Sequence, residues 1–424
     1  MERWSSRYMF LLAAIGSAVG LGNIWRFPYM AGAYGGGTFI VIYLISVALI
    51  GLPLMILEFT AGKHFASPLF PAFSKIGRNI SLISLILHAL NLLILSYYVV
   101  VTGWTLAYLF SSVSGTYAPL AEYSRSSMFP FSTALTLLAI FLIMRMDLKQ
   151  GIEKANSVLM PVFFAILISL LFYSFTLPGL GQALKFYTNF GSVNIETVMA
   201  AISQALFSLS VGAGIMFTYA SHAEKREKTA SAAAIVSFTD TAVALVAGIA
   251  IFPLVFTYGL SPSEGATLAF DTLPLAFLQM PFGNIAMPMF FLLLFSVALT
   301  STISMAEVGV VDLSARTGRK KAAFYLTALI ALLSIPSLLS YSRTNLKFAG
   351  VPVLDYLDGT VVVLVFPVVA LLLVLALGWA WKDFEKESAR ALPEIFLTPY
   401  ILLIRFIIPA VLLVLSLAGL SARI

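Results

Sequence analysis

The sequence predicts an all-α, polytopic membrane protein with about eleven transmembrane helices. Hydrophobic residues make up 60% of the 424 residues and charged residues only 10%, whereas a soluble domain carries about 25% charged residues. The chain also holds many apolar runs longer than the roughly 18 residues that cross a bilayer. The expected spans are residues 8–35, 39–62, 82–112, 131–147, 157–177, 197–221, 230–258, 285–314, 322–341, 354–381 and 397–420.

Basic residues are divided unequally between the two sets of loops. Of the 25 lysines and arginines, 18 lie at inner loops or inner span ends if the N-terminus is cytoplasmic, and only five lie on the outer side. Cytoplasmic loops carry such an excess. We therefore expect a multi-pass protein of the cell membrane, embedded in the lipid bilayer. Its N-terminus would be cytoplasmic and, after an odd number of spans, its C-terminus extracellular. The net charge of +6 then reflects topology, and a nucleic-acid partner is not expected.

The residue types that enzyme chemistry needs are missing or scattered. Cysteine is absent, which excludes a thiolate metal site. His64, His88 and His222 show no metal-ligand spacing, and no nucleophile–base pair is visible in the spans. The sequence predicts neither an enzyme nor an organic cofactor.

The first span is interrupted by residues that are unfavourable in a membrane helix. The stretch "GSAVGLGNIWRFP" (16–28) places three glycines, an asparagine, an arginine and a proline near mid-span. Unwound backbone is tolerated at membrane depth only where it lines a cavity. There, freed carbonyls can bind a cation and the N-terminal end of a half-helix can bind an anion. Arg26 costs at least about 2.5–3.5 kcal/mol unless it faces water or a partner.

A second interrupted span follows five spans later. Residues 204–214, "QALFSLSVGAG", put Ser208, Ser210, Gly212 and Gly214 at mid-span. Broken helices at equivalent positions of two halves indicate an inverted-repeat transporter with its site at mid-membrane. We expect one transmembrane domain over 1–424, with a first repeat at 8–178, a second at 197–381 and an additional helix at 397–420. The alternative for each glycine-rich span is close helix packing. The outer loop at 265–281 is apolar enough to form a short helix.

Motifs along nearly the whole chain resemble those of the neurotransmitter:sodium symporter family, which has the leucine-transporter fold, and its prokaryotic-type amino-acid transporters in particular. Each motif is weak alone, but they occur together and in order. Besides "GSAVGLGNIWRFP", they are "GGGTF" (35–39), "GLPLMILEFTAG" (51–62), "SYYVVVTGW" (96–104), "SLSVGAG" (208–214), "TDTAVALVAGIAIFP" (239–253), "LTSTIS" (299–304) and "LDYLDGT" (354–360).

The resemblance implies a site for a small neutral amino acid. Its carboxylate would meet the backbone amides near Leu21 and Gly22 and the Tyr98 hydroxyl, with Phe207 as a lid. The implied substrate-binding residues are Ala18, Leu21, Gly22, Ile94, Tyr98, Phe207, Ser208, Ser210, Gly212, Ala213, Ser301 and Met305. Because no side chain in this set is charged, an ionic substrate side chain would lack a partner. Relatives often hold a larger residue in place of Ala213, which leaves room for a branched or aromatic substrate.

The resemblance also implies two sodium sites. The first comprises Asn23, Ser208, Asp240 and the carbonyl of Ala18, together with the substrate carboxylate. The second comprises the carbonyls of Gly16, Val19 and Val297 and the hydroxyls of Thr300 and Ser301. These are oxygen ligands, as a hard cation requires. Asp240 supplies a fixed negative charge where chloride-dependent relatives use chloride, and Ala244 replaces a chloride-binding serine, so transport should not need chloride.

The gates are partly implied by the same resemblance. Arg26 is expected to pair with Asp355, although Asp358 lies one turn away and is an alternative. No inner pair is named, because Ala315 occupies the position of the aspartate expected there. The buried carboxylates Glu58 and Glu307 are expected to hold broken-helix backbone.

The function predicted from the sequence is sodium-coupled symport of neutral, apolar amino acids by alternating access. A proton-coupled amino-acid transporter of the same fold is the closest alternative, and the hydroxyl and amide ligands count against it. A non-transporting membrane sensor or a channel is also left open, as is the oligomeric state.

Overall fold

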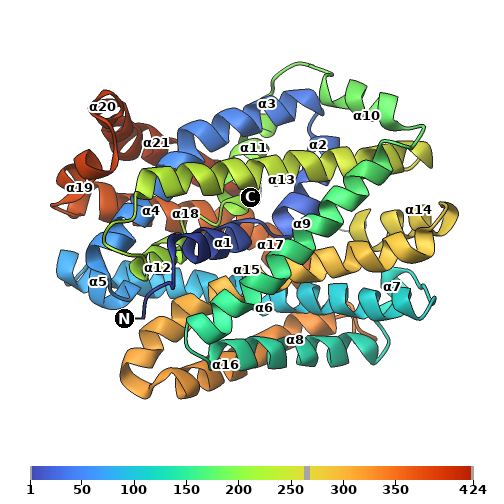
Figure 1. Ribbon diagram of the computed structural model, residues 1–424, viewed down its shortest axis with the longest axis horizontal. Coiled ribbons are helices and arrows are strands. Elements are labelled where there is room, and N and C mark those ends of the chain that lie inside the picture. The colour runs from blue at the N-terminus through green and yellow to red at the C-terminus, as the bar shows by residue number, and fades with distance from the viewer. Residues whose placement is uncertain (1, 262–267, 422–424) are drawn as a thin grey trace.

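The protein is a bundle of long helices that lie side by side (Figure 1). The computed structural model describes residues 2–261 and 268–421. Within these residues eight helices are long and apolar enough to cross a membrane, and a ninth span is the pair α1 and α2, bent by 47° at a break. The shorter apolar helices α8 and α11 complete the eleven spans expected from the sequence. The all-helical fold class is therefore confirmed.

Several spans are built from helical segments joined by π-helical turns. In chain order, the eleven spans are α1 (Arg7–Ala18) with η1 (Gly22–Arg26) and α2 (Phe27–Ala33); α3 (Gly37–Ser46) with η2 (Val47–Gly51) and α4 (Leu52–Phe65); α6 (Ser81–Val113); α8 (Met128–Met144); η3 (Lys149–Glu153) with α9 (Lys154–Ser174); α11 (Ile195–Ser208) with α12 (Ile215–Ser221); α13 (Thr229–Thr257); α15 (Gly283–Thr317); α16 (Arg319–Ser340); α17 (Val353–Thr360) with η5 (Val361–Val365), α18 (Phe366–Leu375) and η6 (Ala376–Ala380); and α20 (Glu394–Leu402) with η7 (Leu403–Ile407) and α21 (Ile408–Ser421).

Short elements cover the two ends of the bundle. They are α5 (Leu69–Ile76), α7 (Leu120–Tyr123), α10 (Leu180–Tyr187), η4 (Leu268–Thr272), α14 (Leu273–Gln279), α19 (Phe384–Ala391) and the antiparallel hairpin of β1 (Lys347–Phe348) and β2 (Val351–Pro352). Figure 1 shows α5 and α19 at the end where the N-terminus lies, and α7, α10 and α14 at the opposite end. The short helix expected at 265–281 corresponds to η4 and α14, while 265–267 lie outside the described residues.

The loops expected on the inner side meet at one end of the bundle, which we call the N-terminal end. Glu2 accepts a hydrogen bond from the Leu148 amide (2.6 Å), and the Lys63 ammonium donates to the Glu227 carbonyl (2.9 Å). The span order therefore places the excess of basic residues together at this end.

The centre of the bundle is formed by α15, which packs along α6 and also against α1 and α9. The window of α15 that would cross a membrane is 83% buried, whereas the corresponding window of α9 is 28% buried. Polar residues on α15 therefore face other helices, where hydroxyls can find partners.

Candidate functional site

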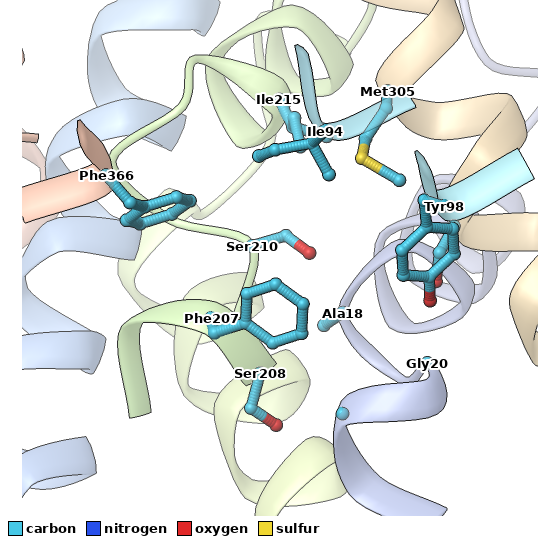
Figure 2. Close-up of a pocket in the computed structure, with 12 residues that line it drawn as sticks. Ala18, Gly20, Ile94, Tyr98, Phe207, Ser208, Ser210, Ile215, Met305 and Phe366 are labelled. Atoms are coloured by element: carbon cyan, nitrogen blue, oxygen red, sulfur yellow. The ribbon is translucent and has the colours of Figure 1, made fainter. Parts of the chain in front are cut away.

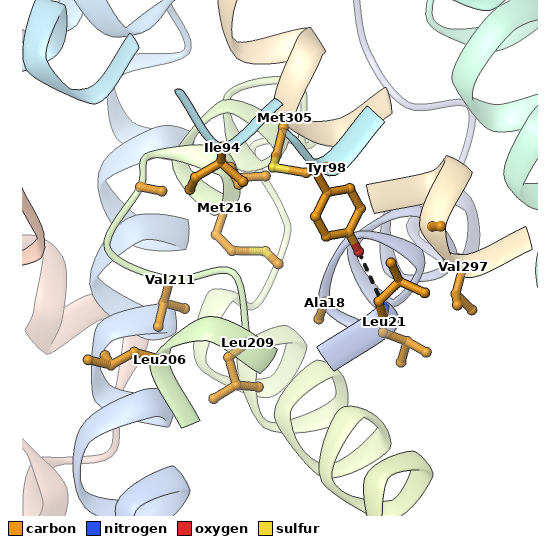
Figure 3. Packing of buried hydrophobic residues seen from close by; sticks show 14 of the residues in the cluster. Ala18, Leu21, Ile94, Tyr98, Leu206, Leu209, Val211, Met216, Val297 and Met305 are labelled. Atoms are coloured by element: carbon orange, nitrogen blue, oxygen red, sulfur yellow. Dashed lines mark hydrogen bonds between the residues drawn. The ribbon is translucent and has the colours of Figure 1, made fainter. Parts of the chain in front are cut away.

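The first chain break follows α1, because the next amides bond to side chains instead of continuing the helix. Val19 is extended, with ψ 115°. The Gly20 amide donates to Asn23 Oδ1 (2.9 Å) and the Leu21 amide donates to the Tyr98 hydroxyl (3.3 Å; Figure 3). In an unbroken helix those two amides bond to the carbonyls of Gly16 and Ser17. The break therefore releases both carbonyls.

The second break joins α11 to α12 through left-handed backbone. Ser210, Gly212 and Gly214 have φ values of 52°, 88° and 75°, a region that glycine enters without steric cost. Glu58 stabilises the break, because its carboxylate accepts bonds from the Gly212 amide (2.5 Å) and the Phe217 amide (3.1 Å). The role expected for Glu58 is confirmed.

Glu307 has a different role from the one expected. Its carboxylate forms a two-bonded ion pair with the Arg319 guanidinium, at 2.8 and 2.9 Å. It holds α16 to α15, and the prediction that it supports broken-helix backbone was wrong.

A small cavity of about 40 Å³ lies between the two breaks (Figure 2). Ile94, Ile215 and Met305 close one side of it in Figure 2, and Phe207 projects from the opposite side. The lining residues are Ala18, Gly20, Gly22, Ile94, Tyr98, Phe207, Ser208, Ser210, Ile215, Ser301, Met305 and Phe366.

Most residues expected at the substrate site lie on this wall, but three do not. Leu21 contributes its amide through the bond to Tyr98, and its side chain is buried elsewhere. Gly212 faces Glu58, and the Ala213 carbonyl accepts a bond from Asn91 (2.9 Å). Ala213 therefore does not line the cavity in this structure.

The residues expected at the first sodium site form one buried cluster. The Asn23 amide nitrogen donates to Ser208 Oγ (3.0 Å) and to Asp240 Oδ1 (2.8 Å), and the Ser208 hydroxyl donates to Asp240 Oδ2 (2.8 Å). Ala18 lies nearby on the cavity wall. The cluster brings α13 against both chain breaks and supplies oxygen atoms that suit a hard cation.

The residues expected at the second site lie where the first break meets α15. The Ser301 hydroxyl is 3.5 Å from the Val19 carbonyl, and the Thr300 hydroxyl donates to the Val297 carbonyl (3.0 Å). A Cβ at Gly20 would stand 2.7 Å from Ser301 Oγ, so a side chain at this position would displace the Ser301 hydroxyl. Gly16 lies in the last turn of α1, with its carbonyl released by the break.

Arg26 contacts the last turns of α11, just before the second break, and not Asp355. Its guanidinium donates to Gln204 Oε1 (2.7 Å) and lies 5.1 Å from the centre of the Phe207 ring. Asp355 instead accepts a bond from the Tyr341 hydroxyl (2.7 Å). Asp358, the alternative partner expected from the sequence, lines a second cavity together with Arg26. The expected pairing with Asp355 is not formed.

At the N-terminal end, bonds to three other segments hold the start of the chain and the first residue of α1. The Trp4 indole donates to the Tyr219 carbonyl (2.9 Å), and Arg7 pairs with Glu227 (3.2 Å). Ser5 donates from its amide and its hydroxyl to the Glu153 carboxylate, at 2.6 Å each. These contacts are formed where sequence reasoning named no pair.

The sequence analysis missed Gln204, Gly20, Ile215 and Phe366. Gln204 joins Arg26 to the Gly22 backbone, because its amide also donates to the Gly22 carbonyl (2.8 Å). In the sequence, Gln204 could have been noticed as a polar amide in an apolar span, one turn before Ser208. Phe366 gave no signal, because nothing in its sequence context separates it from other aromatic residues that face neighbouring helices.

The fold and this cavity define a class: a helical membrane transporter with a site between two broken spans. Comparison with known proteins supplies the family. The profile described as "Sodium:neurotransmitter symporter family" matches residues 1–124 and 120–423. The sodium-dependent transporter YhdH of Bacillus subtilis is 34% identical over 97% of this chain and 96% of its own. A sodium-dependent transporter of Haemophilus influenzae is 31% identical over 99% and 98% of the two chains.

A solved structure agrees with these relatives. The crystal structure of MhsT in complex with L-phenylalanine matches with a TM-score of 0.90 and 38% identity, over 99% of this chain and all of that chain. The chain belongs to the sodium:neurotransmitter symporter family. It is a sodium-dependent transporter of that family, with the leucine-transporter fold, and not an enzyme.

Proposed function

We propose that this protein is a sodium-coupled symporter of neutral, apolar amino acids that works by alternating access and does not need chloride. The observation that carries the proposal is the cavity between the two chain breaks, whose wall includes Ser208 and Ser301 from two clusters of oxygen atoms. Such breaks supply both a donor end for a carboxylate and free carbonyls for a cation.

The cavity wall supports the substrate class. Its side chains are apolar or hydroxyl-bearing, so a substrate side chain with a net charge would be desolvated without a partner. The Tyr98 hydroxyl and the amides of the first break lie together at one side, where an α-carboxylate would be held. MhsT, crystallised with L-phenylalanine, supports the extension to aromatic substrates.

Sodium coupling follows from the two proposed ligand sets. Each positive charge that crosses the membrane takes about 2.3 kcal/mol from a potential of about 100 mV. Two sodium ions with a zwitterionic substrate would draw about twice that, in addition to the sodium gradient. Asp240 supplies negative charge beside the first proposed ion, which supports transport without chloride.

Alternating access is supported by contacts on both sides of the cavity. Toward one end, the cavity is covered by Arg26, Gln204 and Phe207. At the N-terminal end, the start of the chain is held to other segments by the bonds of Trp4, Ser5 and Arg7. We assign the N-terminal end to the cytoplasm, because the basic residues gather there. We also propose that the chain forms a single domain, built from two five-span repeats at 8–178 and 197–381 and an additional helix at 397–420.

A thermal-unfolding screen tests the substrate class. The purified protein would be heated with a panel of amino acids, in sodium chloride or choline chloride. A ligand that binds the folded state at about 100 times its Kd stabilises it by about 2.7 kcal/mol. We expect leucine, methionine and aromatic amino acids to stabilise the protein in sodium only. Stabilisation by glutamate or lysine, with none by the apolar amino acids, would contradict the proposal.

A further inference from the structure

Asn156 presents an unpaired amide oxygen in the interior, at the contact between α9 and α1. The side chain is 1% exposed. Its nitrogen donates to the Ile152 carbonyl of its own helix (2.9 Å), while Oδ1 has no hydrogen-bond partner among the described residues. Buried polar atoms are rarely left unpaired, because each costs about 1–3 kcal/mol. The oxygen is therefore available to accept a bond from a ligand or to coordinate a cation.

The position of this oxygen identifies the kind of ligand. A Cβ at Gly16 would overlap Asn156 Oδ1, so the oxygen lies directly against the Gly16 backbone. The Gly16 carbonyl has itself lost its helical donor, because the Gly20 amide donates to Asn23. Two acceptors cannot satisfy each other. A cation that reached both oxygens would satisfy both, and an all-oxygen set suits a hard cation such as sodium.

Toward the N-terminal end, the same side of this span carries a carboxylate. Glu153 lies one turn before Asn156 and is 6% exposed. Its two oxygens accept the bonds from Ser5. On the other side of Asn156 the helix presents Met160, which is fully buried and close to Gly16. Along this side of the span, the next side-chain oxygens after Asn156 toward the N-terminal end are therefore those of Glu153.

We propose that Asn156 Oδ1 is a further sodium ligand, contributed by α9 to the second sodium site on the side that faces Glu153. The inference rests on the proposed function, which places sodium at the Gly16, Val19, Val297, Thr300 and Ser301 oxygens. Asn156 adds a sixth oxygen and makes α9 part of the site. The ion then has a ligand on the path by which it leaves toward the N-terminal end.

The test measures sodium binding by the purified protein without substrate. Thermal unfolding is recorded at increasing sodium chloride concentrations, and choline chloride keeps the ionic strength constant. Asn156→Leu replaces the amide oxygen and nitrogen with methyl groups on the same branched skeleton, and Asn156→Asp keeps an oxygen and adds charge. We expect the sodium concentration for half-maximal stabilisation to rise about tenfold in the leucine variant, and to stay equal or fall in the aspartate variant. Ser169→Ala is the matched control, because this hydroxyl on the outer surface of α9 bonds only to its own helix.

Each outcome has a distinct meaning. The double variant Thr300→Val, Ser301→Ala is the positive control and should lose sodium stabilisation. If it does so while Asn156→Leu keeps the wild-type midpoint, the inference is overturned and the proposed function stands. Equal shifts in the leucine and aspartate variants would assign Asn156 to packing and also overturn it. If the wild-type protein shows no response to sodium, the proposed function itself fails. Asn156→Ala supplies the same comparison if the leucine variant does not fold.

Discussion

The Ser210 hydroxyl donates to the Ser17 carbonyl across 3.0 Å, and this bond joins two chain breaks that lie 193 residues apart. Ser210 has left-handed backbone with φ 52°, which is uncommon for a residue with a side chain. The Ser17 carbonyl is free only because the Leu21 amide donates to Tyr98. The second break therefore supplies a hydroxyl donor for a carbonyl that the first break leaves free, and the cavity lies between the two breaks.

Removing this link should loosen both breaks. We expect Ser210→Ala to lower the free energy of unfolding by about 1 kcal/mol and to weaken stabilisation by an apolar amino acid. The control is Ser416→Ala, because that buried hydroxyl bonds only to the Leu412 carbonyl of its own helix. Thermal unfolding with and without amino acid measures both effects. Identical curves for the two variants would show that the link between the breaks is not important.

Glu58 should be the main stabilising contact of the second break. Glu58→Ala leaves the buried amides of Gly212 and Phe217 without an acceptor, at a cost of about 1–3 kcal/mol each. Glu58→Gln keeps one acceptor and should lose less. Unfolding temperature in detergent, measured for both variants, checks the order. An alanine variant as stable as the wild type would contradict the assignment.

The fold and much of the site could be predicted from the sequence, because breaks in apolar spans have a local cause. The glycines and polar residues near 16–28 and 204–214 are visible without tertiary information. It was harder to predict which residues pair with each other across helices. Asp355 and Asp358 both occur in α17, and only the packing against α16 brings Asp355 to Tyr341. Asn156 gave no signal either, because its significance depends on the absence of a partner, which sequence cannot reveal.

The gate should depend on Asp358 more than on Asp355. Asp358 shares a cavity with Arg26, whereas the Asp355 carboxylate is occupied by Tyr341. We expect Asp358→Asn to reduce amino-acid uptake several-fold and Asp355→Asn to have a smaller effect on uptake. Uptake by vesicles that contain equal amounts of each folded variant makes the comparison. A larger defect in the Asp355 variant would restore the pairing first expected from the sequence.

Chloride should be dispensable as long as Asp240 is present. Replacing chloride with gluconate at fixed sodium should leave wild-type uptake unchanged. Asp240→Asn removes the negative charge beside Asn23 and Ser208, and should reduce uptake by roughly tenfold or more. Added chloride should partly restore the variant, because it supplies a replacement charge. Wild-type uptake that collapses in gluconate would refute this explanation.

The most direct test of the central claim is uptake of labelled leucine or phenylalanine into proteoliposomes under an imposed gradient. One set of vesicles receives an inward sodium gradient, a second receives the same gradient of choline, and a third receives an inward proton gradient in choline. The account predicts saturable accumulation above the external concentration with sodium only, increased by an inside-negative potential. Accumulation driven by protons without sodium, or entry that never exceeds equilibrium, would contradict it.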